Sequence, residues 1–296
     1  MPVPQRIAVT GASGLIGTAL VGHLKSEGHT VQRLVRRAPV AADEVQWDPQ
    51  TGFVDLEPLR GVDAIIHLAG VGVGDKRWNK KYKSEILNSR LLGTTAIANA
   101  VAELKPQVFI SASAIGWYGE SGNRAVVETD RAGDDFLAAV CREWEAAADL
   151  AGETRTVKIR TGLVLDPTGG ALGKMLPLFR LGLGGKMGNG KQWWSWITLH
   201  DQIRAIVFAL ENPISGPVNV TAPNPVTNQE FTSALARAMH RPALFPAPAI
   251  ALKIALGGFS SEILGSKKVI PHVLQEAGFT WDYPHISEAL TKLVED

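Results

Sequence analysis

Apolar residues recur along the first half of the chain in two alternating patterns. Short and nearly continuous apolar runs at residues 7–9, 62–68 and 108–113 are typical of strands that are covered on both faces. Between these runs, residues 15–27 and 83–104 carry apolar side chains at helical spacing. Such alternation predicts an α/β fold with a doubly wound parallel sheet and helices on both of its faces.

The alternating pattern continues to a sixth strand at residues 156–160 and breaks from Thr168 onward. Glycine-rich turns then surround three tryptophans at 193, 194 and 196, and residues 229–296 are mostly helical and punctuated by prolines. We therefore expect a nucleotide-binding domain over residues 1–228, with an insertion at about 168–200 that belongs to the substrate lobe. Residues 229–296 are expected to complete that smaller, mostly helical lobe.

Composition narrows the class of protein. The chain has 296 residues and a formal net charge of +1, so its charge balance gives no indication of a nucleic-acid partner. Cys141 is the only cysteine, which excludes an internal disulfide and fits a reducing cytoplasm. The N-terminus runs directly into a strand, so no signal peptide is expected. The apolar stretch 243–258 is broken by Pro246, Pro248 and Lys253, so no membrane partner is expected. The sequence leaves open whether the protein forms a homodimer.

The first strand, a glycine turn and the following helix together indicate a dinucleotide site. The spacing is Gly11-x-x-Gly14-x-x-Gly17, placed between a strand and a helix as in Rossmann-like domains. Gly11 allows the sharp turn, Gly14 allows a pyrophosphate to approach the backbone, and Gly17 allows the helix to pack tightly on the strand. The helix N-terminus then presents free N–H groups to the phosphates. The residues expected at the pyrophosphate are Gly11, Ser13, Gly14, Leu15 and Ile16.

The end of the second strand indicates which dinucleotide is bound. NAD-binding proteins usually place an acidic residue there, next to the adenosine ribose, whereas this chain has Arg36. A guanidinium suits a 2′-phosphate, so the predicted cofactor is NADP(H), with Arg37 or Arg33 as a second partner. The alternative is that these arginines form only a solvated basic surface. Leu68 and Ala69, which end the fourth strand, are expected near the adenosine.

Several short motifs together resemble the extended short-chain dehydrogenase/reductases, the superfamily of sugar-nucleotide epimerases and dehydratases. Within it, the chain is most similar to an atypical branch described as epimerase-like or cell-division-inhibitor-like. The resemblance covers essentially the whole chain. The residues that carry it are Thr10-Gly11-Ala12-Ser13-Gly14-Leu15-Ile16-Gly17, His67-Leu68-Ala69-Gly70, Arg77-Trp78, Ser89-Arg90, Ser111-Ala112-Ser113-Ala114, Trp144-Glu145-Ala146-Ala147, Trp196-Ile197, Arg241-Pro242, Val269-Ile270-Pro271 and Gly278-Phe279.

The resemblance also implies where the family's chemistry would lie, and this chain departs from it. Family enzymes use a Tyr-x-x-x-Lys pair followed four residues later by glutamate. Alignment on Glu145 places Leu137 in the tyrosine slot and Cys141 in the lysine slot. Ser113 keeps the position of the family's catalytic serine. We therefore consider Ser113, Cys141 and the nearby phenol Tyr118 as catalytic candidates.

Each candidate also has a purely structural interpretation. A free cysteine on a helix is more often a buried apolar residue than a nucleophile. Ser113 could equally satisfy backbone groups at a strand end. The lysines at 81 and 83 are alternative proton donors, since they lie in a mobile basic stretch. The loss of the family's general acid typically lowers the rate by ~10²- to 10⁴-fold.

Further residues are assigned to the site by the resemblance alone. Glu85 and Arg90 lie on the helix that corresponds to the family's cofactor-flanking helix, and Arg90 replaces an asparagine that the family uses. Leu163 follows the sixth strand. The basic and aromatic run 76–83 fits an anionic small ligand better than nucleic acid. The tryptophans at 193–196 either line a substrate pocket or pack in the core.

Two functions follow from these observations. The first is an NADP(H)-dependent oxidoreductase or epimerase-like enzyme that acts on an unknown small molecule with an unusual acid–base set. The second is a catalytically inactive regulator that binds NADP(H) as a ligand and is linked to cell division. No metal site is indicated by the sequence.

Overall fold

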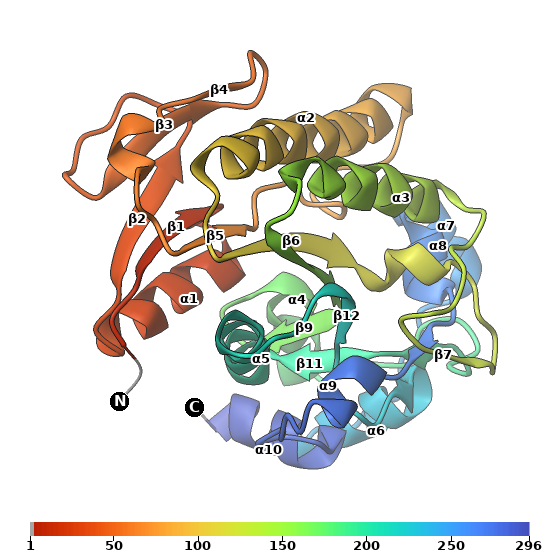
Figure 1. Ribbon diagram of the computed structural model, residues 1–296. Helices are drawn as coiled ribbons and strands as arrows, with labels where there is room; N and C mark the ends of the chain where they lie inside the picture. Colours follow the sequence, from red (N-terminus) through yellow and green to blue (C-terminus); the bar gives the residue numbers. More distant parts are fainter. Residues whose placement is uncertain (1–2, 296) are drawn as a thin grey trace.

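The computed structural model describes residues 3–295 and contains a central eight-stranded sheet (Figure 1). Its strand order is β12-β8-β6-β5-β1-β2-β3-β4, and all neighbours pair in parallel except β3 and β4. This confirms the predicted doubly wound parallel sheet. The strands are β1 (Arg6–Thr10), β2 (Thr30–Val35), β3 (Glu44–Asp48), β4 (Phe53–Val54), β5 (Ala64–His67), β6 (Val108–Ala114), β8 (Arg155–Thr161) and β12 (Gly216–Val220).

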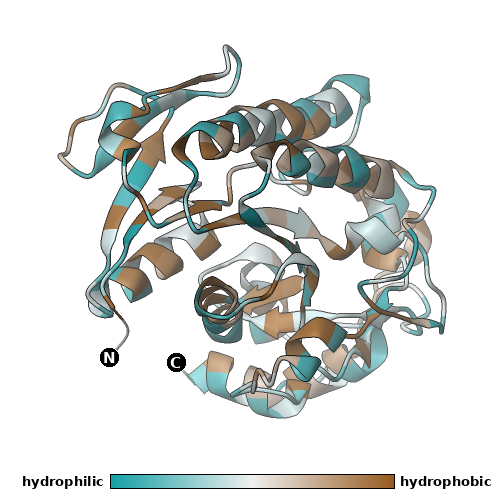
Figure 2. Ribbon diagram, viewed as in Figure 1, coloured by the Kyte–Doolittle hydropathy of each residue, from teal (hydrophilic) through white to brown (hydrophobic). Residues whose placement is uncertain are grey.

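Helices cover both faces of this sheet. α1 (Leu15–Ser26) and α5 (Leu199–Glu211) lie on one face, and α2 (Lys80–Leu104) and α3 (Phe136–Ala148) lie on the other (Figure 1). Successive strand residues point to opposite faces, so central strands such as β1 and β5 contribute to two hydrophobic cores. Figure 2 shows hydrophobic residues along the central strands and mixed surfaces on the covering helices.

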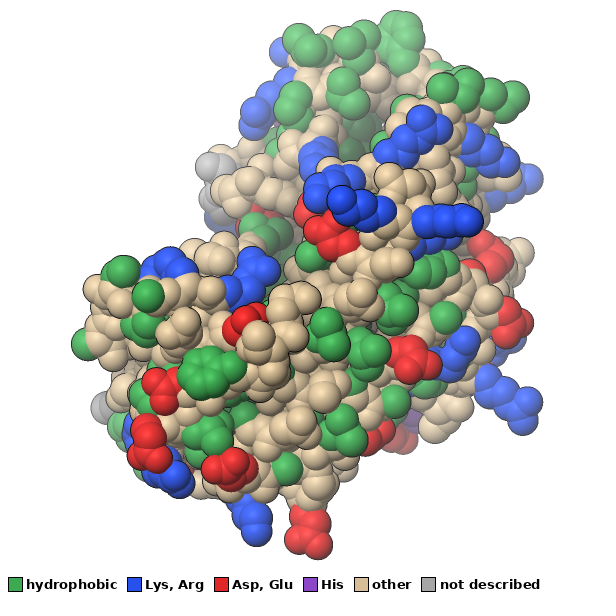
Figure 3. All heavy atoms as spheres, turned by 90° about the horizontal axis from the view of Figure 1, so that it is seen from above, with side chains coloured by type: hydrophobic (Ala, Val, Ile, Leu, Met, Phe, Trp, Pro, Cys, Tyr) green, Lys and Arg blue, Asp and Glu red, His purple; other side chains and the backbone are tan. Residues whose placement is uncertain are grey.

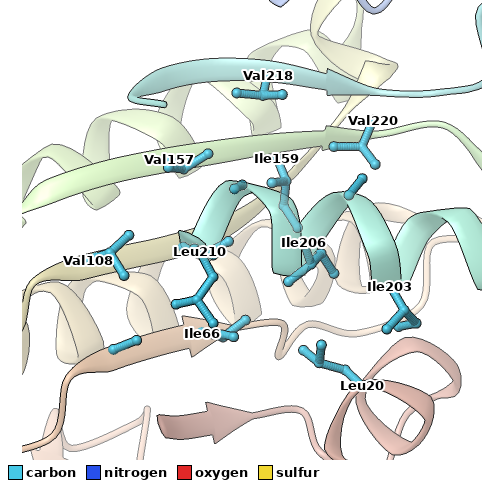
Figure 4. Packing of buried hydrophobic residues seen from close by; sticks show 14 of the residues in the cluster. Leu20, Ile66, Val108, Val157, Ile159, Ile203, Ile206, Leu210, Val218 and Val220 are labelled. Carbon is cyan, nitrogen blue, oxygen red and sulfur yellow. The ribbon is translucent and has the colours of Figure 1, made fainter. Parts of the chain in front are cut away.

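The core between the sheet and α5 illustrates this packing. Ile203, Ile206 and Leu210 lie on the face of α5 that is turned toward the sheet (Figure 4). They meet aliphatic side chains from the central strands, including Val157 and Ile159, and all of these side chains are buried. The continuous apolar runs noticed in the sequence are thus central strands covered on both sides.

Helix boundaries follow from their caps. The side chain of Asn79 accepts a hydrogen bond from the Tyr82 backbone N–H, so α2 begins at Lys80, earlier than its apolar pattern predicted. α3 begins after Asp135, whose carboxylate accepts from the Ala138 N–H. This confirms the helix start predicted there. α6 (Asn228–Ala238) begins with a reciprocal capping box between Thr227 and Glu230.

A second lobe is built from two separate segments of the chain. Residues of the inserted segment and of the C-terminal segment share one hydrophobic cluster, in which Leu172, Trp196, Phe231 and Leu290 are buried.

Among the described residues, no helix combines the length and apolar character needed to cross a bilayer. The remaining elements are η1 (Glu57–Leu59), η2 (Ile115–Tyr118), β7 (Ala125–Val126), η3 (Asp149–Ala151), β9 (Leu163–Asp166), α4 (Gly170–Arg180), β10 (Trp193–Trp194), β11 (Trp196–Thr198), β13 (Val226–Thr227), α6 (Asn228–Ala238), α7 (Ala249–Leu256), α8 (Ser260–Leu264), β14 (Lys268–Val269), α9 (His272–Glu276) and α10 (Ile286–Glu295).

Candidate functional site

The glycine turn between β1 and α1 has the form that a pyrophosphate site requires. Gly11 has φ +68°, a conformation that other residues rarely adopt. Gly14 is the N-cap residue of α1, and no side chain caps the start of this helix. A Cβ on Gly17 would lie 2.1 Å from the Gly11 carbonyl oxygen, so Gly17 is needed for tight packing. A Cβ on Gly14 would meet only that oxygen, at 3.4 Å. The helix N-terminus therefore keeps free N–H groups beside open space.

Leu15, Ser13 and Ile16 surround this turn from the helix side. Ser13 and Gly14 are exposed, and Leu15 and Ile16 are half-buried. A Cβ on Gly169 would lie 3.2 Å from Leu15 Cδ1, so the loop between β9 and α4 packs against the first turn of α1. The second lobe thus closes over one side of the glycine turn.

The end of β5, with Leu68 and Ala69, forms the neighbouring wall of the turn. Both backbone N–H groups donate to Thr10 Oγ1, at 3.1 and 3.3 Å. A Cβ on Gly11 would lie within 2.9 Å of their backbone, so only glycine fits there. The segment that carries Leu68 and Ala69 is therefore fixed directly beside the turn.

A buried histidine that the sequence analysis left without a role fixes this arrangement. His67 Nδ1 lies 2.7 Å from Thr10 Oγ1, and His67 Nε2 lies 3.1 Å from Thr94 Oγ1. Thr10 already accepts two N–H groups, so its own proton must point to Nδ1, and Nε2 carries the ring proton. Burial lowers the pKa of His67 to about 3, so the ring is neutral. A histidine within an otherwise apolar strand was the available signal for this role.

Three arginines near the end of β2 have different surroundings. Arg33 makes two hydrogen bonds to Asp43, at 2.7 and 3.0 Å, and Arg37 makes two to Glu44, at 2.7 and 2.8 Å. Arg36 is exposed and forms no hydrogen bond or ion pair within residues 3–295. Arg33 and Arg37 are thus already paired with carboxylates. Arg36 is the guanidinium that stays available for an anion.

Ser113 and Tyr118 lie in a buried polar network. Ser113 Oγ donates to Glu145 Oε1 at 2.7 Å, and Arg160 binds both oxygens of Glu145, at 2.8 and 2.9 Å. Arg160 also donates to the Tyr118 hydroxyl at 3.0 Å, and that hydroxyl donates to Asn219 Oδ1 at 2.7 Å. Ser113 is 3% exposed and Tyr118 is 4% exposed. Both hydroxyl protons are therefore held inside the protein.

The electrostatics of Tyr118 agree with this geometry. Burial raises the pKa of its phenol to about 12, despite the opposing effect of the nearby Arg160. A proton donor that works near neutral pH usually has a pKa close to that pH. The structure therefore favours a structural role for Tyr118 over the catalytic role considered from sequence.

Cys141 lies in the interior beside η2. It is 3% exposed, and its Sγ lies 3.6 Å from the Ala114 carbonyl oxygen. A Cβ on Gly116 would lie 3.2 Å from Leu137 and 3.6 Å from Cys141 Sγ, so the two replaced family positions both pack against η2. Burial raises the pKa of the thiol to about 12. These observations favour the buried apolar interpretation of Cys141.

Arg90 holds the turn that follows β5. Its guanidinium donates to the carbonyl oxygens of Val71 and Ile86, at 2.9 and 3.1 Å, and stacks on the Trp144 ring at 4.8 Å. A Cβ on Gly70 would lie 3.6 Å from the guanidinium carbon. Arg90 thus positions the backbone next to Leu68 and Ala69, a role that its sequence position did not reveal.

Glu85 and the basic run lie at the junction of the two lobes. Lys76 Nζ lies 3.5 Å from Glu85, and Lys83 Nζ lies 4.7 Å from the centre of the Phe136 ring. The Trp78 ring packs against Phe136 at 5.2 Å and against Phe259 of the C-terminal segment at 5.8 Å. The basic run at 76–83 therefore also has a structural role, because its side chains pack against both lobes.

The remaining predicted residues lie in the second lobe. Leu163 is half-buried in β9 and pairs with Trp196 of β11. Trp196 is completely buried and belongs to the core, whereas Trp193 and Trp194 are half-buried. The Trp193 indole donates to Asn123 at 3.0 Å. Of the three tryptophans, Trp196 is accounted for by core packing.

A group of possible metal ligands occurs at one place among residues 3–295. His200, Asp201 and Asp282 lie within 4.8 Å of one another. Asp201 accepts from two backbone N–H groups and pairs with Arg204, and His200 bonds Asp282 at 2.7 Å. The carboxylate oxygens of Asp201 and Asp282 already have partners, and the Arg204 guanidinium lies beside them. The group is therefore best described as a surface ion-pair network.

Comparison with known proteins agrees with this geometry. The model of the NAD dependent epimerase/dehydratase family matches residues 7–221, and that of the domain of unknown function DUF1731 matches residues 247–293. Epimerase family protein ML0860 of Mycobacterium leprae is 44% identical over 290 residues, covering 96% of this chain and 94% of the relative. Epimerase family protein SDR39U1 of Bos taurus is 37% identical over 299 residues, covering 98% and 100%.

A solved structure extends the comparison. The crystal structure of human epimerase family protein SDR39U1 (isoform 2) with NADPH matches with a TM-score of 0.91 and 34% identity, covering 98% of this chain and 99% of that one. MoeE5 in complex with UDP-glucose and NAD matches with a TM-score of 0.78 and 20% identity, a likeness of fold alone. The site described above thus lies in a chain whose whole length resembles these proteins.

Proposed function

Because this chain belongs to the NAD dependent epimerase/dehydratase family, with a C-terminal DUF1731 domain, we propose that it is an NADP(H)-dependent oxidoreductase or epimerase-like enzyme acting on a small molecule. The observation that carries the cofactor assignment is the free Arg36 guanidinium at the end of β2. The NADPH in the crystal structure of human SDR39U1 supports the same assignment. When bound, NADPH supplies a hydride.

The residues around the glycine turn fit this dinucleotide. The uncapped N-terminus of α1, with Gly11 and Gly14, suits a pyrophosphate. Leu68 and Ala69 form the wall expected at the adenosine. Arg36 would meet the 2′-phosphate with two parallel hydrogen bonds, each worth about 1.5–3 kcal/mol. Since ~1.4 kcal/mol is a factor of ten, one such contact gives about tenfold discrimination against NAD(H).

The proton chemistry must differ from that of the family's usual enzymes. Leu137 and Cys141 offer no acid in the tyrosine and lysine slots, and the Ser113 proton is held by Glu145. Reduction of a carbonyl requires a proton at the new hydroxyl oxygen. The remaining sources are solvent water and the lysines of the 76–83 run, of which Lys83 is half-buried. We therefore expect little turnover of ordinary sugar-nucleotide substrates.

Calorimetric titration of both cofactors tests the assignment. We expect wild-type protein to bind NADPH at least about tenfold more tightly than NADH, and Arg36→Ala to remove that difference. Arg37→Ala is the matched control, because its guanidinium is held by Glu44 and should contribute little to discrimination. Equal wild-type affinities, or an Arg36→Ala variant that still prefers NADPH, would contradict the assignment.

The second function is a regulator that binds NADP(H) without turnover. It is favoured by the interior positions of Ser113 and Tyr118, which leave the family's catalytic serine tied to a structural ion pair. A panel of aldehydes, ketones and nucleotide sugars, followed by the absorbance of NADPH, separates the two functions. Turnover that falls in Lys83→Met supports the enzyme. Tight NADPH binding without oxidation by any panel member supports the regulator.

A further inference from the structure

The second lobe carries a concentration of exposed large hydrophobic side chains. Within residues 3–295, six of the twelve exposed large hydrophobic residues lie in two short segments, 181–183 and 244–254. Leu181, Leu244, Ile250 and Ile254 are each between 69% and 73% exposed. We call these six residues the apolar patch: Leu181, Leu183, Leu244, Phe245, Ile250 and Ile254.

The two segments form one continuous surface. The Phe245 N–H donates to the Gly184 carbonyl oxygen at 3.2 Å, and the Ala247 N–H donates to the Lys186 carbonyl oxygen at 2.9 Å. α7 follows directly and has the sequence Ala-Ile-Ala-Leu-Lys-Ile-Ala-Leu, yet none of its residues is buried. A helix that is apolar on all sides normally lies in a core or a membrane. An exposed apolar area of this kind indicates a binding surface.

The two chain stretches that carry the apolar patch contain basic residues but no acidic ones. Residues 167–200 and 231–261 contain no aspartate or glutamate. None of their lysines or arginines forms an ion pair with another described residue. The upper end of the molecule in Figure 3 shows hydrophobic side chains beside Lys and Arg side chains. The basic residues of the two segments are Lys174, Arg180, Lys186, Lys191, Arg237, Arg241 and Lys253.

We propose that the apolar patch and its basic surround bind the surface of an anionic lipid bilayer, with the α7 side chains placed at the level between headgroups and acyl chains. Aliphatic side chains flanked by unpaired Lys and Arg are the combination that binds such surfaces. Such a contact lies on the membrane surface and does not cross it. The sequence analysis expected no membrane partner, because the apolar stretch 243–258 is too interrupted to span a bilayer.

A second copy of the chain fits this surface less well. In a two-fold symmetric dimer the same patch meets itself, so basic residues would face basic residues without any acid from residues 167–200 or 231–261. Like charges that face one another at an interface oppose association. Anionic lipid headgroups supply the missing negative charge. Each Lys or Arg near such a surface raises the affinity for the membrane by about fivefold.

Co-sedimentation of the full-length protein with vesicles tests the proposal. We expect binding to vesicles of phosphatidylcholine mixed with phosphatidylglycerol, weak binding to phosphatidylcholine alone, and release as salt is raised. The double variant Ile250→Ser with Ile254→Ser should lower partitioning by about tenfold or more. The matched control is Val40→Ser with Leu150→Ser, which removes exposed apolar side chains outside the patch.

All four substituted residues are exposed, so the variants should fold, and thermal melting followed by circular dichroism checks this directly. The proposal is overturned if wild-type protein does not bind the anionic vesicles, or if the control variant loses binding as fully as the α7 variant. It is also overturned if sedimentation velocity shows a stable dimer that the α7 variant dissociates. In that case a second copy covers the patch.

Discussion

Arg160 shows how a single residue determines what its neighbours can do. It binds both oxygens of Glu145 in the interior, and through them it fixes Ser113, while another of its nitrogens reaches Tyr118. Its guanidinium also lies 3.9 Å from the centre of the Trp117 ring. Loss of one partner from such a buried ion pair typically costs about 3–5 kcal/mol, because the other charge stays buried. The network is therefore a buried structural unit that holds both hydroxyl groups.

At this scale we predict the outcome of Tyr118→Phe. The change removes the donor to Asn219 and the acceptor from Arg160, so the free energy of unfolding should fall by about 1–3 kcal/mol. NADPH affinity should stay the same, because the hydroxyl is buried in the network. Urea unfolding and calorimetry measure the two quantities. A variant with wild-type stability but without NADPH oxidation would instead identify Tyr118 as a proton donor.

At the scale of elements, the glycine turn combines two separate requirements. Gly17 is required by the protein itself, because its Cβ would overlap the Gly11 carbonyl. Gly14 has room for a side chain and a φ of −78°, which any residue adopts. The fold therefore requires glycine at position 17 but places no such requirement on position 14.

These two glycines make a paired prediction. Gly17→Ala should lower the free energy of unfolding by about 1–3 kcal/mol through overpacking. Gly14→Val should leave the melting temperature nearly unchanged and abolish NADPH binding in calorimetry. If Gly14→Val binds NADPH as the wild type does, the turn is only structural.

The junction of β2 and β3 gives a prediction on pH. The hydrogen bonds from Arg37 lower the pKa of Glu44 to about 2 from an ordinary value of 4.5, assisted by the Val40 N–H. Glu44 therefore stabilises the fold above pH 4.5, and this contribution is lost as the pH falls toward 2. Glu44→Gln should melt at a lower temperature than the wild type at pH 7, and the difference should shrink by pH 3. A difference that is independent of pH would show that the ion pair does not contribute.

At the scale of the whole molecule, the C-terminal segment contacts the first part of the chain at several places, including the pairing of β14 with β7. Trp78 lies in the segment after β5, and its ring packs on Phe259 of the C-terminal segment. Its indole donates to the Val73 carbonyl oxygen at 2.7 Å. On the other side of the sheet, Asn219 donates to the Ile270 carbonyl oxygen at 3.0 Å. The C-terminal segment is therefore tied to the nucleotide-binding domain at both places.

Removal of the Trp78 ring should loosen the C-terminal segment locally. We expect Trp78→Ala to lower the free energy of unfolding by about 1–3 kcal/mol. We also expect faster amide hydrogen exchange over residues 257–265 but not over residues 6–10 of the central strand. Exchange that rises equally in both segments would mean that Trp78 contributes only to global stability.

The sequence by itself determined the α/β architecture, the glycine turn and the position of Arg36. These features depend on local patterns, since strand and helix periods and the glycine spacing are set by neighbouring residues. The start of α3 at Asp135 was predicted for the same reason. The start of α2 was predicted later than Lys80, because its first turn is defined by the Asn79 cap rather than by apolar spacing.

Only the tertiary structure decided which chemically capable residues are free. The sequence favoured Arg36 as the partner of the 2′-phosphate but left Arg33 and Arg37 as second candidates. The carboxylates that hold these two arginines come from β3 and the loop before it. Ser113 is structural because Glu145 of α3 accepts its proton, and Tyr118 is structural because Arg160 and Asn219 reach it from other strands. Availability of a side chain depends on partners that are distant in sequence, so a local pattern carries no information about it.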